Sequence, residues 1–236
     1  MQDNKIAQDF NKSAYDVLTV FIDLVDGEWI DADKYKDIMS YLKFFYDGRA
    51  KPDIYLECRH TKVKISIKSG HNPSIHQENF FDFIKFLKRI GISSRTIKII
   101  SFYHFGKTKK LSNNGKPFTK DEIIKNYGKY LKQANEEINK KKIIEEIIYR
   151  TIIKGAKTDR EEIDYLYYGS SEKVFLLSIE DIYSLVIKDK KEDILQLHFG
   201  GLIYQPSGRR EDRVDRYYSR IKWPILCVKF YDNKII

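Results

Sequence analysis

Residues 52–68 constrain the fold more than any other part of the chain. Apolar side chains stand at positions 54, 56 and 58 and again at 63, 65 and 67, with mostly polar residues between them. This period of two is typical of β-strands, and residues 59–61 are enough to turn the chain. We therefore expect an antiparallel hairpin, in which Asp53 and Lys68 lie near each other on the polar face.

The residues after the hairpin predict a helix. Residues 69–73 are rich in turn formers, and Ser74 can then cap a helix with Gln77 three residues later, as in a capping box. Glu78 would lie near the first turn of that helix, which can pack back toward the end of the strand. An aspartate–lysine pair is also consistent with an ordinary surface salt bridge, which is common and weak.

This pattern resembles the PD-(D/E)xK nuclease superfamily, whose motif is Pro-Asp followed, after a variable gap, by an acid, any residue and lysine. Pro52-Asp53 and Lys68 match the motif, whereas Ser66 stands where the motif has its acid. That departure resembles a variant found in some restriction endonucleases, in which the triplet reads Ser-any-Lys and the acid lies on the following helix. By this resemblance the migrated acid is Glu78, with Glu57 in reserve.

The resemblance implies a Mg²⁺-dependent active site. Hydrolysis of a phosphodiester needs charge neutralisation on the phosphate and an activated water, and Mg²⁺ supplies both through oxygen ligands. Asp53 and Glu78 would bind the metal. Lys68 would hold the attacking water or stabilise the developing charge, and Ser66 would orient a water or a ligand.

The composition is compatible with a nucleic-acid partner. The 236 residues contain 43 Lys and Arg against 34 Asp and Glu, a formal net charge of +9. Such an excess favours an anionic partner, and nucleic acid fits best. The abundance of Lys, Ile, Asn and Tyr is equally typical of codon bias in an AT-rich genome, so the charge alone leaves the question open.

Other features exclude several classes of protein. The apolar runs are far shorter than the roughly 20 residues that cross a bilayer. Because residues 1–5 lead into polar sequence, we expect no secretory signal. Cys58 and Cys227 both lie in apolar segments and read as buried thiols of a reducing compartment. We expect a cytoplasmic protein with no membrane partner. There is no glycine-rich nucleotide loop and no Cys/His metal spacing.

Periodicity and capping signals give the remaining elements. Helices are expected at 5–25, 30–46, 75–90, 119–138, 143–153 and 178–187. Strands are expected at 96–105, 165–169, 173–177, 194–204 and 224–231. His104 is expected to be structural. The basic loop 106–117 fits a solvated linker and a phosphate contact equally well.

The C-terminal segment predicts a basic hairpin at about 194–231. Arginine makes bidentate contacts with phosphate or guanine edges that lysine does not match, and arginine is the scarcer base in this chain. The expected nucleic-acid contacts are Arg209, Arg210, Arg213, Arg216, Arg220 and Lys222. The alternative is a charged hairpin tip that is partly neutralised by Glu211, Asp212 and Asp215.

Together these features predict an α/β fold of restriction-endonuclease-like type, with a mixed β-sheet flanked by helices. We expect a single domain over residues 1–236 with an inserted helical subdomain at about 119–155. The resemblance implies a bacterial Mg²⁺-dependent endonuclease for double-stranded DNA of type II restriction type, a homodimer, and a separate DNA methyltransferase that protects the host. Three alternatives stay open: a non-catalytic DNA-binding module with the nuclease fold, a nuclease acting on RNA or in DNA repair, and an interaction domain whose motif is coincidental.

Overall fold

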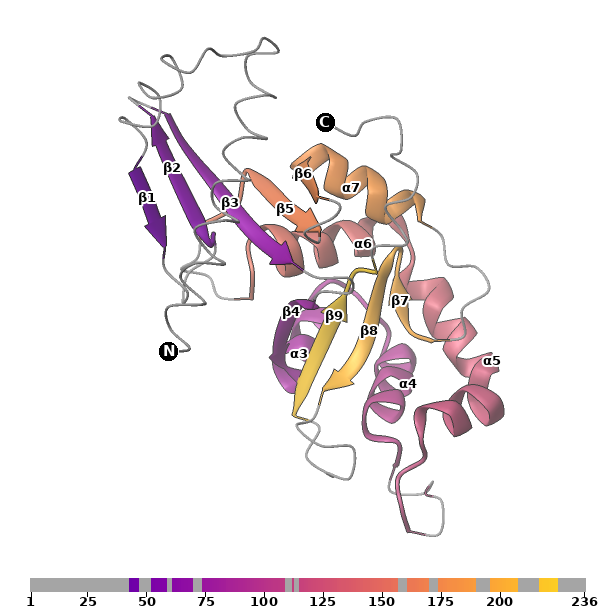
Figure 1. The fold of residues 1–236 in the computed structure, drawn as a ribbon. Helices are drawn as coiled ribbons and strands as arrows, with labels where there is room; N and C mark the ends of the chain where they lie inside the picture. Colours follow the sequence, from indigo (N-terminus) through magenta and orange to yellow (C-terminus); the bar gives the residue numbers. More distant parts are fainter. Residues whose placement is uncertain are drawn as a thin grey trace, which may run out of the picture. The chain divides into compact units, whose positions relative to one another are not determined.

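The computed structural model describes residues 43–46, 52–58, 61–69, 74–108, 112, 115–156, 161–169, 174–189, 196–207 and 217–224 (Figure 1). The chain divides into two compact units. The first contains Met1–Gly70, Arg160–Ile179 and Phe230–Ile236, and the second contains His71–Asp159 and Glu180–Lys229. The segment predicted as a helical insertion at about 119–155 lies within the second unit.

The first unit contains a mixed five-stranded sheet in the order β1-β2-β3-β5-β6. Its strands are β1 (Lys43–Tyr46), β2 (Ile54–Cys58), β3 (Thr61–Ser69), β5 (Tyr165–Gly169) and β6 (Val174–Ser178). Strands β3 and β5 are parallel and the other neighbours are antiparallel. The predicted hairpin is confirmed, with Leu56 of β2 opposite Val63 of β3.

The second unit contains an antiparallel four-stranded sheet in the order β4-β9-β8-β7. Its strands are β4 (Ser74–Asn79), β7 (His198–Phe199), β8 (Leu202–Ser207) and β9 (Tyr218–Lys222). Strands β8 and β9 pair as an antiparallel hairpin within the segment where a basic C-terminal hairpin was predicted, but the predicted strands were 194–204 and 224–231. Residues beyond 224 lie outside the described part of the chain.

The described helices are α3 (Phe80–Arg89), α4 (Ser94–Phe105), α5 (Lys120–Ile138), α6 (Lys141–Ile148), the π-helix η1 (Tyr149–Ile153) and α7 (Ile179–Lys188). The predicted capping box is confirmed at the start of α5, where Thr119 and Glu122 cap each other's backbone N–H groups. None of the helices in these ranges has the length and apolar composition needed to cross a bilayer.

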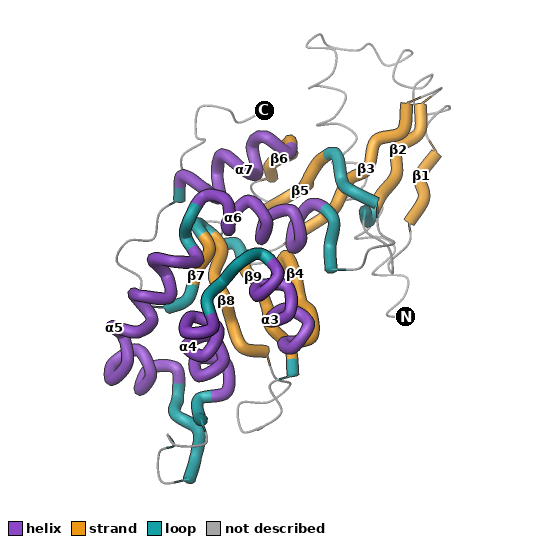
Figure 2. Tube along the Cα trace, turned by 180° about the vertical axis from the view of Figure 1, so that it is seen from behind, coloured by secondary structure: helices purple, strands orange, loops and turns teal. Residues whose placement is uncertain are grey.

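Helices α3 and α4 cover one face of the second sheet (Figure 2). The Phe83 ring of α3 stacks on Tyr204 of β8, with ring centres 5.8 Å apart, and joins the helix to the sheet. Phe80 of α3 stacks on His104 at 4.0 Å and joins α3 to α4. His104 is fully buried, and its Nδ1 lies 2.6 Å from the Tyr204 hydroxyl. The predicted structural role of His104 is thereby confirmed.

The strand predicted at 96–105 is wrong, because these residues form helix α4. The Ser93 side chain caps the helix by accepting a hydrogen bond from the Thr96 N–H, and Gly106 ends it with φ +69°. One face of the helix carries the buried residues Thr96, Ile97, Ile100, Tyr103 and His104, and Phe102 is buried separately against Phe118 and Tyr127. Capping at both ends and burial of one face outweigh the β-propensity of these residues.

The helix start predicted at Ser74 is also wrong. Residues 74–79 form strand β4, which pairs with β9, and helix α3 begins at Phe80. The N-cap is Asn79, whose side chain accepts a hydrogen bond from the Phe81 N–H. The partner strand lies more than a hundred residues away in sequence, so no local signal reveals it. Residues 43–46 likewise form strand β1 where the end of a helix was predicted, and the helix predicted at 5–25 lies outside the described residues.

Candidate active site

The structure brings Asp53, Ser66 and Lys68 together at the end of the β2–β3 hairpin. The register pairs Ile54 with Ile65, and the Asp53 N–H donates to the Ile65 carbonyl at 3.0 Å, which places Asp53 beside Ser66. One carboxylate oxygen of Asp53, Oδ2, accepts hydrogen bonds from the Ser66 hydroxyl and the Ile67 N–H, both at 2.7 Å, and lies 3.5 Å from Lys68 Nζ. Three of the four predicted catalytic residues therefore share one cluster.

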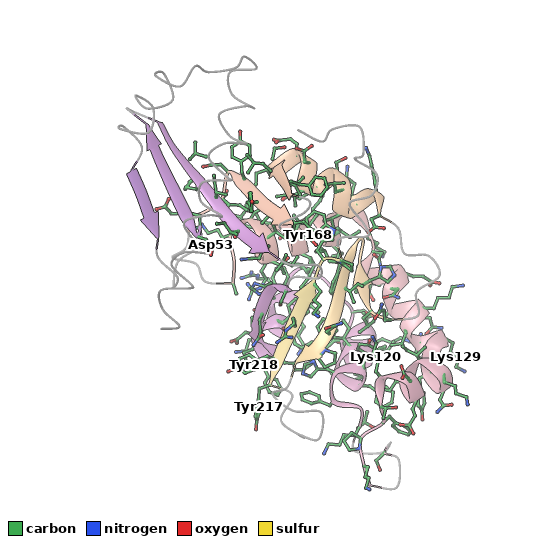
Figure 3. The ribbon with its side chains drawn as sticks, in the orientation of Figure 1. Asp53, Lys120, Lys129, Tyr168, Tyr217 and Tyr218 are labelled. Carbon is green, nitrogen blue, oxygen red and sulfur yellow. The ribbon has the colours of Figure 1, made fainter. Side chains whose placement is uncertain are left out.

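This cluster is partly accessible. The side chains of Asp53 and Lys68 are 26% and 21% exposed, whereas Ser66 is fully buried (Figure 3 labels Asp53). Lys68 Nζ also donates to the Ile67 carbonyl at 2.9 Å, so the ammonium group is held at the carboxylate by two acceptors. The other carboxylate oxygen, Oδ1, accepts no hydrogen bond from the described residues.

The Asp53 carboxylate fits the role of one Mg²⁺ ligand among several. Mg²⁺ is commonly bound through one or two carboxylates, with waters and substrate phosphates filling the remaining positions. Within the part of the chain that the structure describes, no group of three or more His, Cys, Asp or Glu side chains could hold a metal by itself. Asp53 therefore fits an ion whose coordination is completed by water and substrate.

Glu57, the reserve ligand, is poorly placed to join Asp53. It stands four residues further along the chain, and an extended segment of that length spans roughly 13 Å between Cα atoms. Its backbone pairs with Lys62 on β3, well away from Ser66. The backbone geometry therefore argues against Asp53 and Glu57 sharing one ion.

Glu78 belongs to the second unit, on strand β4 and not on a helix. Both of its carboxylate oxygens are engaged: Arg150 donates from Nε to Oε1 at 3.0 Å and from Nη2 to Oε2 at 2.6 Å, and His76 Nε2 lies 3.0 Å from Oε1. Burial alone would raise the pKa of Glu78, but the hydrogen bonds and positive charges of His76 and Arg150 outweigh it and lower the pKa. The carboxylate is ionised at neutral pH and already neutralised by its neighbours.

Sequence reasoning missed His76 and Arg150. With β4 recognised as a strand, His76 and Glu78 would have been placed on one face, since they are two residues apart. Arg150 lies in the π-helix η1 with its guanidinium 4.5 Å from the Phe86 ring centre, and nothing local links it to Glu78. Such π-helical turns are rare and are often found at functional positions.

The predicted nucleic-acid contacts are described only in part. Arg220 and Lys222 lie on β9, and Arg220 donates to the Gln77 side-chain oxygen of β4 from Nη2 at 3.1 Å and from Nε at 3.4 Å. The other four, Arg209, Arg210, Arg213 and Arg216, lie outside the described residues. Their role stays a prediction.

Comparisons with known proteins add no family to this picture. A scan against models of protein families found no match, and a search of curated proteins found none either.

Proposed function

We propose that the protein is a Mg²⁺-dependent nuclease with a restriction-endonuclease-like catalytic unit that hydrolyses phosphodiester bonds in double-stranded DNA. One observation carries the proposal: the Asp53 carboxylate accepts hydrogen bonds from Ser66 and Lys68 at the end of a hairpin. The proximity of the Pro-Asp pair to the Ser-any-Lys triplet supports the proposal. Ser66 and Lys68 lie on β3 of a mixed sheet, and the sheets and helices of the described residues are compatible with an α/β fold.

Each residue of the cluster has a distinct task in this proposal. The Ser66 hydroxyl and the Ile67 N–H hold one oxygen of Asp53, Oδ2, which fixes the carboxylate, and Oδ1 would bind the metal. When bound, Mg²⁺ would neutralise the phosphate and promote ionisation of a water. Lys68 supplies a positive charge beside Asp53, where charge develops on the phosphate oxygens. A fixed carboxylate and a fixed ammonium need little rearrangement during the reaction.

A second candidate function is supported by Glu78. Its two oxygens are bound by Arg150 and His76, so it would have to give up a hydrogen bond in order to hold a metal. With serine at position 66, Asp53 is then the single carboxylate that the described residues bring to the site. These facts favour a DNA-binding module that keeps the nuclease fold without cleaving.

Cleavage of supercoiled plasmid separates the two candidates. Wild-type protein is incubated with plasmid in Mg²⁺ or in EDTA, and nicked and linear products are followed over time. A nuclease gives products only with Mg²⁺, whereas a non-catalytic module retards the plasmid in both conditions and cuts it in neither.

Lys68→Met tests the assigned lysine, with Lys64→Met as the matched control. Lys64 lies on the same strand and face, but its Nζ is 3.7 Å from Glu161 and it takes no part in the Asp53 cluster. Loss of one stabilising charge is expected to slow cleavage by about 10²–10³-fold in Lys68→Met and to leave Lys64→Met nearly unchanged. Equal rates for the two variants would refute the assignment. Glu78→Gln in the same assay shows whether the second acid is needed.

A further inference from the structure

The face of the second sheet opposite α3 and α4 has the composition of a recognition surface. Alternation along β9 directs Ser219 and Ile221 to the buried side and Tyr218, Arg220 and Lys222 to the outer side. The register places Gln77 of β4 and Gln205 of β8 on either side of Arg220. These five side chains, Gln77, Gln205, Tyr218, Arg220 and Lys222, are called the outer-face cluster.

The outer-face cluster combines charge, amide groups and an exposed ring. Tyr218 is 48% exposed and lies at one end of β9 (Figure 3), whereas Arg220 and Lys222 are half-buried and follow it at every second position. No member of the cluster is acidic. The only carboxylate on β4, Glu78, lies on the buried side and is already bound by Arg150.

These groups match the chemistry of a nucleic acid. Arginine and lysine neutralise phosphates, glutamine amides can read base edges, and an exposed tyrosine ring offers a surface on which a base can stack. Gln77 accepts hydrogen bonds from Arg220 and so holds the Arg220 guanidinium over the sheet. Because the arginine side chain is already ordered, it loses less conformational entropy when a phosphate binds.

The width of the sheet decides which form of nucleic acid fits. Strands lie about 4.8 Å apart, so the backbones of β4, β9 and β8 span roughly 10 Å before their side chains are counted. The major groove of B-DNA is about 12 Å wide and admits a helix or a two-stranded ribbon. A sheet of this width cannot enter it flat, and bases within a duplex are already stacked on each other.

We infer that the outer-face cluster binds single-stranded or locally unpaired nucleic acid, with a base stacked on Tyr218 and phosphates at Arg220 and Lys222. The inference rests on the proposed function only in taking nucleic acid as the partner. It adds a site for unpaired nucleotides in the second unit, made of residues that have no part in the Asp53 cluster.

The test measures binding in EDTA, where metal-dependent cleavage cannot occur. The full-length protein is titrated into a fluorescein-labelled single-stranded DNA of mixed sequence and into the duplex made from the same strand, with fluorescence anisotropy as the readout. Tyr218→Ala is expected to weaken single-strand binding by about 5- to 150-fold, and Tyr218→Phe to retain it. Arg220→Ala should lower the dependence of log affinity on log salt by about 0.7.

Tyr130→Ala is the matched control, since Tyr130 is an exposed tyrosine on α5, 39% exposed, outside the cluster. The inference is overturned if Tyr218→Ala binds the single strand as tightly as wild type. It is equally overturned if the protein binds the duplex more tightly than the single strand and if Tyr218→Ala weakens duplex binding as much as single-strand binding. A protein that binds the single strand through Tyr218 but cuts nothing with Mg²⁺ would retain this inference and lose the proposed nuclease function.

Discussion

Replacement of Arg150 by methionine should destabilise the second unit strongly. The Arg150 and Glu78 side chains are 13% and 6% exposed, and two hydrogen bonds join them. Methionine keeps much of the volume of the side chain but leaves the ionised carboxylate of Glu78 with His76 alone. Removing one partner of a buried ion pair costs about 3–5 kcal/mol, because the remaining charge stays out of water.

The double variant Glu78→Gln/Arg150→Met identifies the origin of that cost. It removes both charges, so no ionised group is left buried without its partner. The loss of stability should therefore be smaller than the sum of the two single losses, with a coupling of about 1–3 kcal/mol. The control is an exposed ion pair, in which Lys85 Nζ lies 3.1 Å from Asp82 Oδ1 and the two side chains are 78% and 59% exposed. Lys85→Met should cost no more than about 1 kcal/mol.

Urea unfolding followed by tryptophan fluorescence measures these effects in the second unit. The chain has two tryptophans, and replacing Trp29 by phenylalanine leaves only Trp223, which is fully buried in the second unit. A single reporter matters because a chain of two compact units need not unfold in one step. The reasoning is refuted if Arg150→Met loses no more stability than Lys85→Met, or if the effects of Glu78→Gln and Arg150→Met are additive.

Three further predictions concern the fold. Gly106→Ala should lower the free energy of unfolding by about 2–4 kcal/mol, as measured by thermal unfolding, because φ is +69° and the new Cβ would clash with the Phe118 carbonyl. Gly91→Ala should lower it less, because φ is +92° there but the Cβ would meet open space. Tyr204→Phe should lower the free energy of unfolding by about 1–3 kcal/mol through loss of a buried hydrogen bond to α4. Because folding lowers the pKa of Glu78, its ionised carboxylate should stabilise the fold at neutral pH, and this contribution should fade as the pH falls below 4.5. In Glu78→Gln the urea midpoint should therefore change less with pH below 4.5 than in the wild type.

The sequence predicted the β2–β3 hairpin because its signals are local. An alternation of period two on both sides of a short turn leaves few other conformations, and the register then follows from the turn. That register is sufficient to place Asp53 beside Ser66 and Lys68. The capping box at Thr119 and the aromatic strand at 165–169 were predicted for the same reason.

The elements that were mispredicted depend on partners distant in sequence. Residues 74–79 resemble a helix start until β9 supplies the pairing that makes them a strand. The β-branched residues of α4 become helical because Ser93 and Gly106 cap the helix and one face is buried. The bidentate contact of Arg150 with Glu78 joins residues 72 positions apart, and no periodicity predicts it.

The most direct test of the central claim is the initial rate of plasmid cleavage by the wild type and by Asp53→Asn, purified in parallel and compared at saturating Mg²⁺. Asparagine preserves the size of the side chain but removes the negative charge that the metal and Lys68 require. The account predicts Mg²⁺-dependent cleavage by the wild type and a rate at least about 10²-fold lower for the variant, a loss of roughly 3 kcal/mol in transition-state stabilisation. Equal rates for the two proteins, or no cleavage by the wild type with Mg²⁺, would contradict it.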